Sequence, residues 1–107
     1  METFYIGKDN ASKLLLSNDG VAQDISSLTK VEVRYDGTTY SSEDYADAFD
    51  WTTYGEDGYL ILKMGLISAI TESGMDIAAE IIAYDSDNIN GIVWGTFEVE
   101  MKDLSEE

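Results

Sequence analysis

The fold is decided by the stretch Lys30-Val31-Glu32-Val33-Arg34-Tyr35-Asp36-Gly37-Thr38-Thr39-Tyr40-Ser41. In its first half Val31, Val33 and Tyr35 alternate with charged residues, which is the period of a half-buried strand. The Asp-Gly pair that follows is a strong signal for a tight hairpin turn. We therefore predict a strand over residues 30–35 that returns as a partner strand over residues 38–41.

Similar alternation continues on both sides of this hairpin. We predict further strands over residues 3–7, 12–17, 59–64, 75–85 and 92–101, and shorter extended pieces within residues 21–28 and 49–51. Residues 42–48 have the length of one helical turn, and residues 66–73 suit either such a turn or an irregular loop. In the last strand, the alternation predicts inward side chains at Val93, Phe97, Val99 and Met101 and an outward side chain at Trp94.

These segments amount to seven or eight short strands at roughly 8–12-residue spacing, separated by turns rich in Gly, Asn and Asp. The pattern is typical of an all-β protein built as an antiparallel β-sandwich or a small barrel. We expect one domain over residues 1–107, with a charged tail over residues 102–107 that frays. Because the chain has no Pro, outward Glu and Asp side chains must protect its edge strands.

The composition is strongly acidic. The 107 residues carry 22 Asp and Glu against 6 Lys and Arg, which gives a formal net charge of −16. This charge repels phosphate backbones and anionic lipid heads, so we expect neither a nucleic acid nor a membrane as a partner. No stretch reaches the about 18 apolar residues of a membrane span, and the first residues do not resemble a secretory signal.

The chain contains no Cys and no His. Their absence excludes disulfides, thiolate nucleophiles, Ser-His-Asp catalysis, structural zinc sites and haem ligation by either residue. It also leaves the redox compartment open. We expect no cofactor, and only Asp and Glu remain as acid–base groups.

One candidate metal site is the acidic loop Asp85-Ser86-Asp87-Asn88, which has the alternating oxygen donors of a calcium loop. An EF-hand needs Gly at its sixth position and Glu at its twelfth, where this sequence has Asn90 and Thr96. We therefore interpret the loop as a turn between two strands that is capped by its own side chains, and we expect no metal site.

A second acidic region is a candidate for catalysis, because paired carboxylates perform acid–base chemistry in glycosidases. It comprises Glu43, Asp44, Asp47, Asp50, Glu56 and Asp57. A small sandwich seldom supplies the concave pocket that a sugar substrate needs, and carboxylates in loops are ordinarily a solvated face. We therefore do not expect an enzyme.

The candidate partner contacts are outward aromatic and apolar side chains, because Tyr and Trp are enriched at interface cores and exposed apolar patches mark interaction sites. The strand phase puts the aromatic side chains of Tyr59, Tyr84 and Trp94 outward, and outward Ile82 and Ile92 add apolar surface beside them. The predicted partner-binding residues are Tyr59, Ile82, Tyr84, Asp85, Asp87, Asn88, Ile92 and Trp94. The alternative is that the phase is misassigned and these aromatic side chains pack between the sheets.

Three stretches resemble a known group of proteins. They are the opening Phe4-Tyr5-Ile6-Gly7-Lys8-Asp9-Asn10, the corner Asp24-Ile25-Ser26-Ser27-Leu28 leading into Val31-Glu32-Val33, and the closing block Ala83-Tyr84-Asp85-Ser86-Asp87-Asn88-Ile89-Asn90-Gly91-Ile92-Val93-Trp94-Gly95. Together they are similar to small proteins of tailed bacteriophages encoded among virion structural genes. They are more distantly similar to the N-terminal immunoglobulin-like domain of phage baseplate upper proteins. The similarity spans nearly the whole chain, and the closing block is its most specific part.

The resemblance implies an immunoglobulin-like β-sandwich that is a structural part of the virion, present in many copies and made in the bacterial host cytoplasm. It implies a head decoration, a neck or collar, or a tail or baseplate component that contacts other capsid, neck or tail subunits. Family members with baseplate or fibre roles carry additional C-terminal regions, which favours a decoration, collar or adaptor role here. The resemblance implies no catalytic residue.

Other classes of function remain as alternatives. The first is a carbohydrate-binding module displayed on a virion for attachment to glycans, which needs aromatic side chains on one flat face beside carboxylates or amides. An enzyme would have only Asp and Glu for its chemistry. A DNA mimic would spread its charge evenly along one surface, whereas many carboxylates here are in turns.

Overall fold

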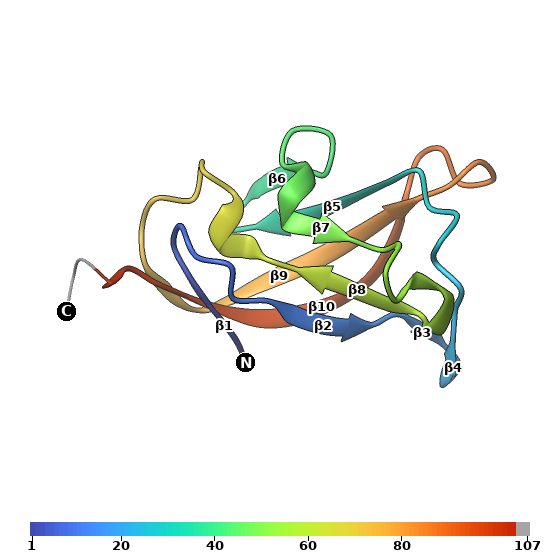
Figure 1. The fold of residues 1–107 in the computed structure, drawn as a ribbon, viewed down its shortest axis with the longest axis horizontal. Coiled ribbons are helices and arrows are strands. Elements are labelled where there is room, and N and C mark those ends of the chain that lie inside the picture. Colours follow the sequence, from blue (N-terminus) through green and yellow to red (C-terminus); the bar gives the residue numbers. More distant parts are fainter. Residues whose placement is uncertain (105–107) are drawn as a thin grey trace.

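The computed structural model describes residues 1–104, and within that range the chain forms strands and short 3-10 helices but no α-helix (Figure 1). None of these helices has the length and apolarity that crossing a membrane requires. The strands are β1 (Glu2–Tyr5), β2 (Ser12–Leu15), β3 (Ser17–Asn18), β4 (Val21–Ala22), β5 (Lys30–Tyr35), β6 (Thr38–Ser41), β7 (Phe49–Asp50), β8 (Tyr59–Leu62), β9 (Gly74–Tyr84) and β10 (Ile92–Lys102). The 3-10 helices are η1 (Ala46–Ala48), η2 (Gly55–Asp57) and η3 (Met64–Leu66).

The strands form two main sheets. The larger has five strands in the order β1-β10-β9-β5-β6, and the smaller has three in the order β2-β8-β7. In Figure 1 the smaller sheet lies over the larger one, and the short hairpin β3–β4 extends from the end of β2. Every strand pair is antiparallel except β1 with β10. The predicted β character is therefore confirmed, as a mostly β protein with mostly antiparallel sheets.

The hairpin over residues 30–41 has the predicted boundaries, since β5 covers residues 30–35 and β6 covers residues 38–41. Asp36 and Gly37 both have positive φ, at 51° and 80°. This is the requirement of a two-residue type I′ turn, whose twist matches the strands that it joins. Val31 and Val33 are fully buried on the predicted face.

One cluster of buried side chains lies between the two sheets. β5 contributes Val31 and Val33, and β8 contributes Leu60 and Leu62, all with no exposed surface. Phe4, Met64 and Met101 join the same cluster from β1, η3 and β10. Full burial of each such side chain stabilises the fold by about 1.5–3 kcal/mol. The packing of the two sheets on this cluster therefore positions every loop described below.

The predicted phase of the last strand is wrong at its start. The pairing of β10 with β9 shifts between Val93 and Gly95, so Trp94 is the extra residue of a β-bulge. Val93 is consequently 59% exposed although it was predicted to point inward, and Trp94 packs against the core although it was predicted to point outward. Ile92 pairs with buried Ala83 and so lies on the face opposite to the predicted one, but its side chain is 40% exposed, as predicted for an outward residue. Beyond the bulge, Phe97, Val99 and Met101 face the core as predicted.

Two further expectations need correction. The strands β9 and β10 have 11 residues each, so the predicted strands are not all short. The predicted fraying tail does not begin at Lys102, because Lys102 pairs with Tyr5 and its carbonyl accepts a hydrogen bond from the Ile6 amide at 2.9 Å. Residues 105–107 of that tail lie outside the described residues.

The parallel strand β1 is fixed in place by a close backbone approach at Gly65 in η3. The Gly7 amide donates a hydrogen bond of 2.8 Å to the Gly65 carbonyl. A Cβ atom at Gly65 would lie 2.1 Å from the carbonyl oxygen of Tyr5 and 2.7 Å from that of Lys8. Only glycine leaves room for this backbone contact.

Gly65→Ala is therefore expected to lower the free energy of unfolding by about 1–3 kcal/mol, because the new methyl group forces two backbone segments apart. Gly95→Ala is the matched control, since a Cβ there meets nothing within 4 Å. Its effect should stay within about 0.5 kcal/mol. Urea unfolding followed by circular dichroism compares the two variants, and equal stability of both would contradict the close approach.

Candidate partner-binding surface

The structure brings most of the predicted partner-binding residues together around the β9–β10 hairpin. Ile82 and Tyr84 end β9, the residues 85–88 follow in the loop, and Ile92 and Trp94 begin β10. Tyr59 is the exception, because it lies on β8 in the smaller sheet. The predicted residues therefore do not form one continuous surface.

Tyr84 is held by its own sheet. Its hydroxyl donates a hydrogen bond to the Glu32 carboxylate, and the Lys30 Nζ atom lies 4.2 Å from the centre of its ring. Lys30 also lies 3.7 Å from the Glu32 carboxylate and 3.6 Å from that of Glu43. The hydrogen bond to Glu32 is the main cause that raises the pKa of Tyr84. The phenol therefore stays protonated and fixed in direction at neutral pH.

The loop that joins β9 to β10 ends on this Tyr84 ring. Gly91 has a φ of 86°, and a Cβ atom there would lie 2.7 Å from the Tyr84 ring and 2.9 Å from the Ile82 side chain. Glycine thus permits both the positive φ and the close packing. The last residue of the loop therefore packs on the face of the sheet that carries the Tyr84 and Ile82 side chains.

The acidic loop has the predicted capped turn. One carboxylate oxygen of Asp85 accepts hydrogen bonds from the Asp87 amide at 2.9 Å and from the Asn88 amide at 2.7 Å. The Asn88 side-chain amide donates a third bond to it at 3.0 Å. Within residues 1–104, no group of three or more acidic side chains is arranged to hold a metal ion. Asp85 and Asn88 therefore shape the loop, whereas Asp87 is exposed.

Trp94 links β10 to the neighbouring hairpin. Its indole packs against the core cluster, and its Nε1 atom donates a hydrogen bond of 3.1 Å to the Ser17 carbonyl. For Trp94, the strand phase was therefore misassigned, and the alternative prediction, that its ring packs inside the protein, is the correct one. The sequence did contain a signal for this, because an isolated glycine inside a strand, here Gly95, marks bulges.

Tyr59 on the smaller sheet is also covered by a neighbour. The Lys13 Nζ atom lies 4.3 Å from the centre of the Tyr59 ring and 4.5 Å from that of the exposed Tyr54 ring. Cation–π contacts of this kind stabilise by about 0.5–1 kcal/mol at exposed sites. Tyr59 is therefore half-buried in a contact that the chain makes with itself.

Several large apolar side chains near the β9–β10 loop are also exposed, and most of them were not selected by the sequence analysis. We call this surface the apolar end and define it by four exposed side chains: Val21, Ile89, Ile92 and Val93, with exposed fractions of 63%, 77%, 40% and 59%. Figure 1 shows the β3–β4 hairpin and the tip of the β9–β10 hairpin at the same end of the molecule. A groove between the β3–β4 hairpin and the start of β10 is lined by Ser17, Asn18, Gln23, Ile92, Val93 and Trp94.

The second acidic region has a structural role at Asp50. Its carboxylate accepts hydrogen bonds from the Thr52 amide at 2.9 Å, the Thr53 amide at 3.1 Å and the Thr53 hydroxyl at 2.6 Å. These bonds, led by the Thr53 hydroxyl, lower the pKa of Asp50 to about 2. Asp50 therefore caps the turn after β7 as a carboxylate.

Asp50→Ala is expected to lower the free energy of unfolding by about 1–2 kcal/mol at pH 7, because several donors in the turn lose their acceptor. The folded-state pKa lies below the ordinary 3.8, so the stabilisation is complete above pH 4 and is lost as the pH falls through 2. The difference between wild type and variant should shrink over that range in urea unfolding. Asp57→Ala, at an exposed carboxylate in η2, is the control, and its effect on the free energy of unfolding at pH 7 should stay within about 0.5 kcal/mol.

Trp94→Phe is expected to destabilise the protein by about 1 kcal/mol, because the ring still packs but the hydrogen bond to Ser17 is lost. Val93→Ala changes the exposed neighbour and should stay within about 0.5 kcal/mol. Thermal unfolding of both variants makes the comparison. A larger loss from Val93→Ala than from Trp94→Phe would contradict the assigned directions of the two side chains.

Comparison with known proteins adds no family to this description. A scan against protein-family models and a search of curated proteins both found no match to this chain. The function is therefore inferred from the surface, charge and contacts of the residues described above.

Proposed function

We propose that this protein is a structural interaction subunit of a tailed-phage particle, which acts through protein–protein contacts and catalyses no reaction. The phage assignment comes from the sequence resemblance, and the candidates are a head decoration, a neck or collar, and a tail or baseplate component. The observation that carries the interaction role is the apolar end, where large apolar side chains are exposed on two neighbouring hairpins. Its place of action would be the virion.

The fold that we propose is an immunoglobulin-like β-sandwich. The order β10-β9-β5-β6 corresponds to G-F-C-C′ of that fold, and β2-β8-β7 corresponds to B-E-D. The shared core cluster between the sheets supports the same assignment. In such sandwiches the loops gather at the two ends and are the usual place for recognition. The apolar end is one of these loop clusters.

The apolar end has the character of an interface centre. Val93 and Ile89 are more than half exposed, although their burial in a contact would stabilise it by about 1.5–3 kcal/mol each. The turn that Asp85 caps precedes Ile89, and the close packing at Gly91 follows it, so both hold this loop in one shape. A preorganised surface loses little conformational entropy when it binds.

The charge of the chain indicates the kind of partner. With a net charge of −16, a second copy of the chain is repelled and a basic protein surface is attracted. We therefore propose a partner whose contact surface is apolar at its centre and basic around it. This charge would also keep the free subunit soluble before assembly.

The proposal is tested with the double variant Ile89→Glu/Val93→Glu. It should fold like wild type, because both side chains are exposed, but its amount in purified particles should fall more than about tenfold because two apolar contacts are lost. The measurement is quantitative mass spectrometry of particles assembled with the variant as the only source of the subunit.

The matched control is Ala11→Glu/Leu104→Glu, which adds the same charge at two exposed apolar side chains outside both the apolar end and the β9–β10 hairpin. It should be incorporated like wild type. Normal incorporation of the first variant, or equal loss of both, would refute the assignment of the apolar end. Particles that never contain the wild-type chain would refute the proposed function itself.

A further inference from the structure

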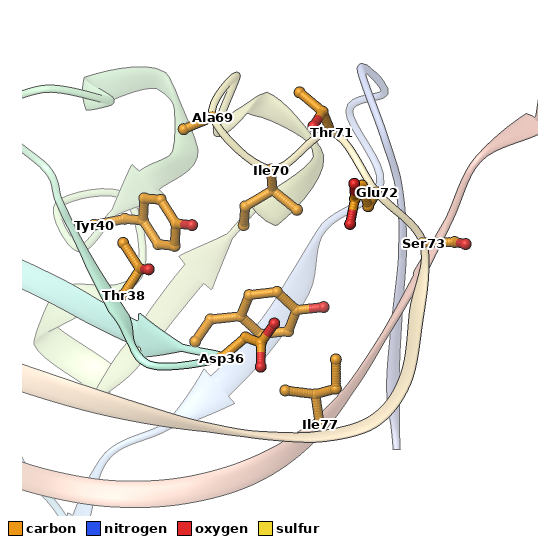
Figure 2. Close-up of a pocket in the computed structure, with 10 residues that line it drawn as sticks. Asp36, Thr38, Tyr40, Ala69, Ile70, Thr71, Glu72, Ser73 and Ile77 are labelled. Atoms are coloured by element: carbon orange, nitrogen blue, oxygen red, sulfur yellow. The ribbon is translucent and has the colours of Figure 1, made fainter.

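A pocket of about 170 Å³ lies at the other end of the larger sheet, between the β5–β6 turn and residues 69–73. Figure 2 shows Tyr40, Ile70 and Glu72 along one side of this space and Asp36 and Ile77 along the other. The ring of Tyr40 is held edge-on by Tyr45, with a centroid distance of 6.0 Å and an interplanar angle of 71°. The pocket thus has walls of defined shape.

An unpartnered hydroxyl group lines this pocket. Tyr35 is only 4% exposed, and its hydroxyl makes no hydrogen bond with any residue in the range 1–104. The hydroxyl oxygen lies 3.0 Å from the position that a Cβ atom would take on Gly74, so the glycine leaves it uncovered. No side-chain oxygen of the described residues is both buried and without a hydrogen-bond partner, so this hydroxyl is the part of Tyr35 that is open to the pocket. It can therefore bond to water there or to a polar group of a ligand.

The residues that line the pocket include two carboxylates, Asp36 and Glu72, and no Lys or Arg. Neither Asp36 nor Glu72 has a salt-bridge partner within the described part of the chain. Burial, followed by the charge of Asp36, raises the pKa of Tyr35, so its hydroxyl stays protonated and neutral. Two unpaired carboxylates beside tyrosine rings repel anions and attract an ammonium or guanidinium group. The same chain already places lysines over tyrosine rings at Tyr84 and Tyr59.

The size of the pocket restricts the ligand further. Pockets for small molecules enclose about 300–1,000 Å³, which is clearly more than the about 170 Å³ available here. The space suits one side chain or a group of similar size.

We propose that this pocket binds a lysine or arginine side chain presented by the protein partner. The identity of the ligand as a side chain rests on the proposed function, because that function makes the partner a protein with a basic surface. The charged group would lie against Asp36 and Glu72, its aliphatic stem against Ile70 and Ile77, and the Tyr35 hydroxyl would contact it directly or through a water.

The test is a titration of the isotope-labelled protein with N-acetyl-argininamide and with N-acetyl-lysinamide at constant ionic strength, followed by amide chemical shifts. Saturable shifts are expected at residues 35–40 and 69–77. N-acetyl-glutaminamide and galactose are the neutral comparisons and should shift these amides little. Asp36→Asn/Glu72→Gln should weaken binding of the cations about five- to tenfold, because each exposed ion pair contributes modestly.

The chain offers a matched control for general attraction of cations to an acidic protein. Asp19 and Gly20 form a second turn with φ values of 52° and 78°, nearly those of Asp36 and Gly37. Asn is favoured at both turn positions, so Asp36→Asn and Asp19→Asn remove the same charge from the same backbone conformation. Asp19→Asn should leave binding unchanged. Tyr35→Phe should weaken binding while leaving thermal stability equal or higher, because it removes only the unpartnered hydroxyl.

The outcomes separate this proposal from the proposed function. Equal effects of Asp19→Asn and Asp36→Asn, or shifts scattered over the whole surface, would overturn the pocket whatever the particle experiment gives. Stronger binding of galactose would overturn it in favour of a carbohydrate site. Failure of the particle experiment together with saturable cation binding would leave the pocket in place and refute its role in assembly.

Discussion

Burial of aliphatic side chains between the two sheets is the interaction on which this structure depends. Val33 of β5 and Leu60 of β8 have no exposed surface, and they meet in a cluster that both sheets share. The chain has no Cys or His that would add a disulfide or a zinc site through those residues, and its net charge of −16 opposes compaction. The apolar layer must therefore outweigh a considerable electrostatic repulsion, and it sets the positions of both loop ends.

The sequence predicted the β5–β6 hairpin because two local signals agree there: a strict alternation of side chains and an Asp-Gly turn that needs positive φ. It failed at Trp94 because a β-bulge inserts one residue and reverses the phase of those before it. The parallel pairing of β1 with β10 was not predictable either. Alternation specifies which face of a strand is buried and contains no information on the direction of its neighbour.

The candidate surfaces were predictable only where they follow one another in the chain. The β9–β10 hairpin is continuous in sequence, so Tyr84, Asp85 and Ile92 were found together although their directions were partly wrong. Val21 comes to the same end of the molecule through the fold, and no local pattern marks it. The pocket at Tyr35 is lined by the β5–β6 turn and by a loop more than thirty residues later in the chain. Only the tertiary structure therefore brings Asp36 and Glu72 together.

The parallel pair β1–β10 has a mechanical consequence. Its register runs from Glu2 opposite Val99 to Tyr5 opposite Lys102, so both strands point the same way. Tension applied at Glu2 and at Lys102 in opposite directions acts along the strands and across their hydrogen bonds. The hydrogen bonds between the two strands then share the load in shear. In a hairpin pulled apart at its open end, by contrast, the hydrogen bonds break one after another. A chain tethered at these two points is thereby well suited to resist stretching.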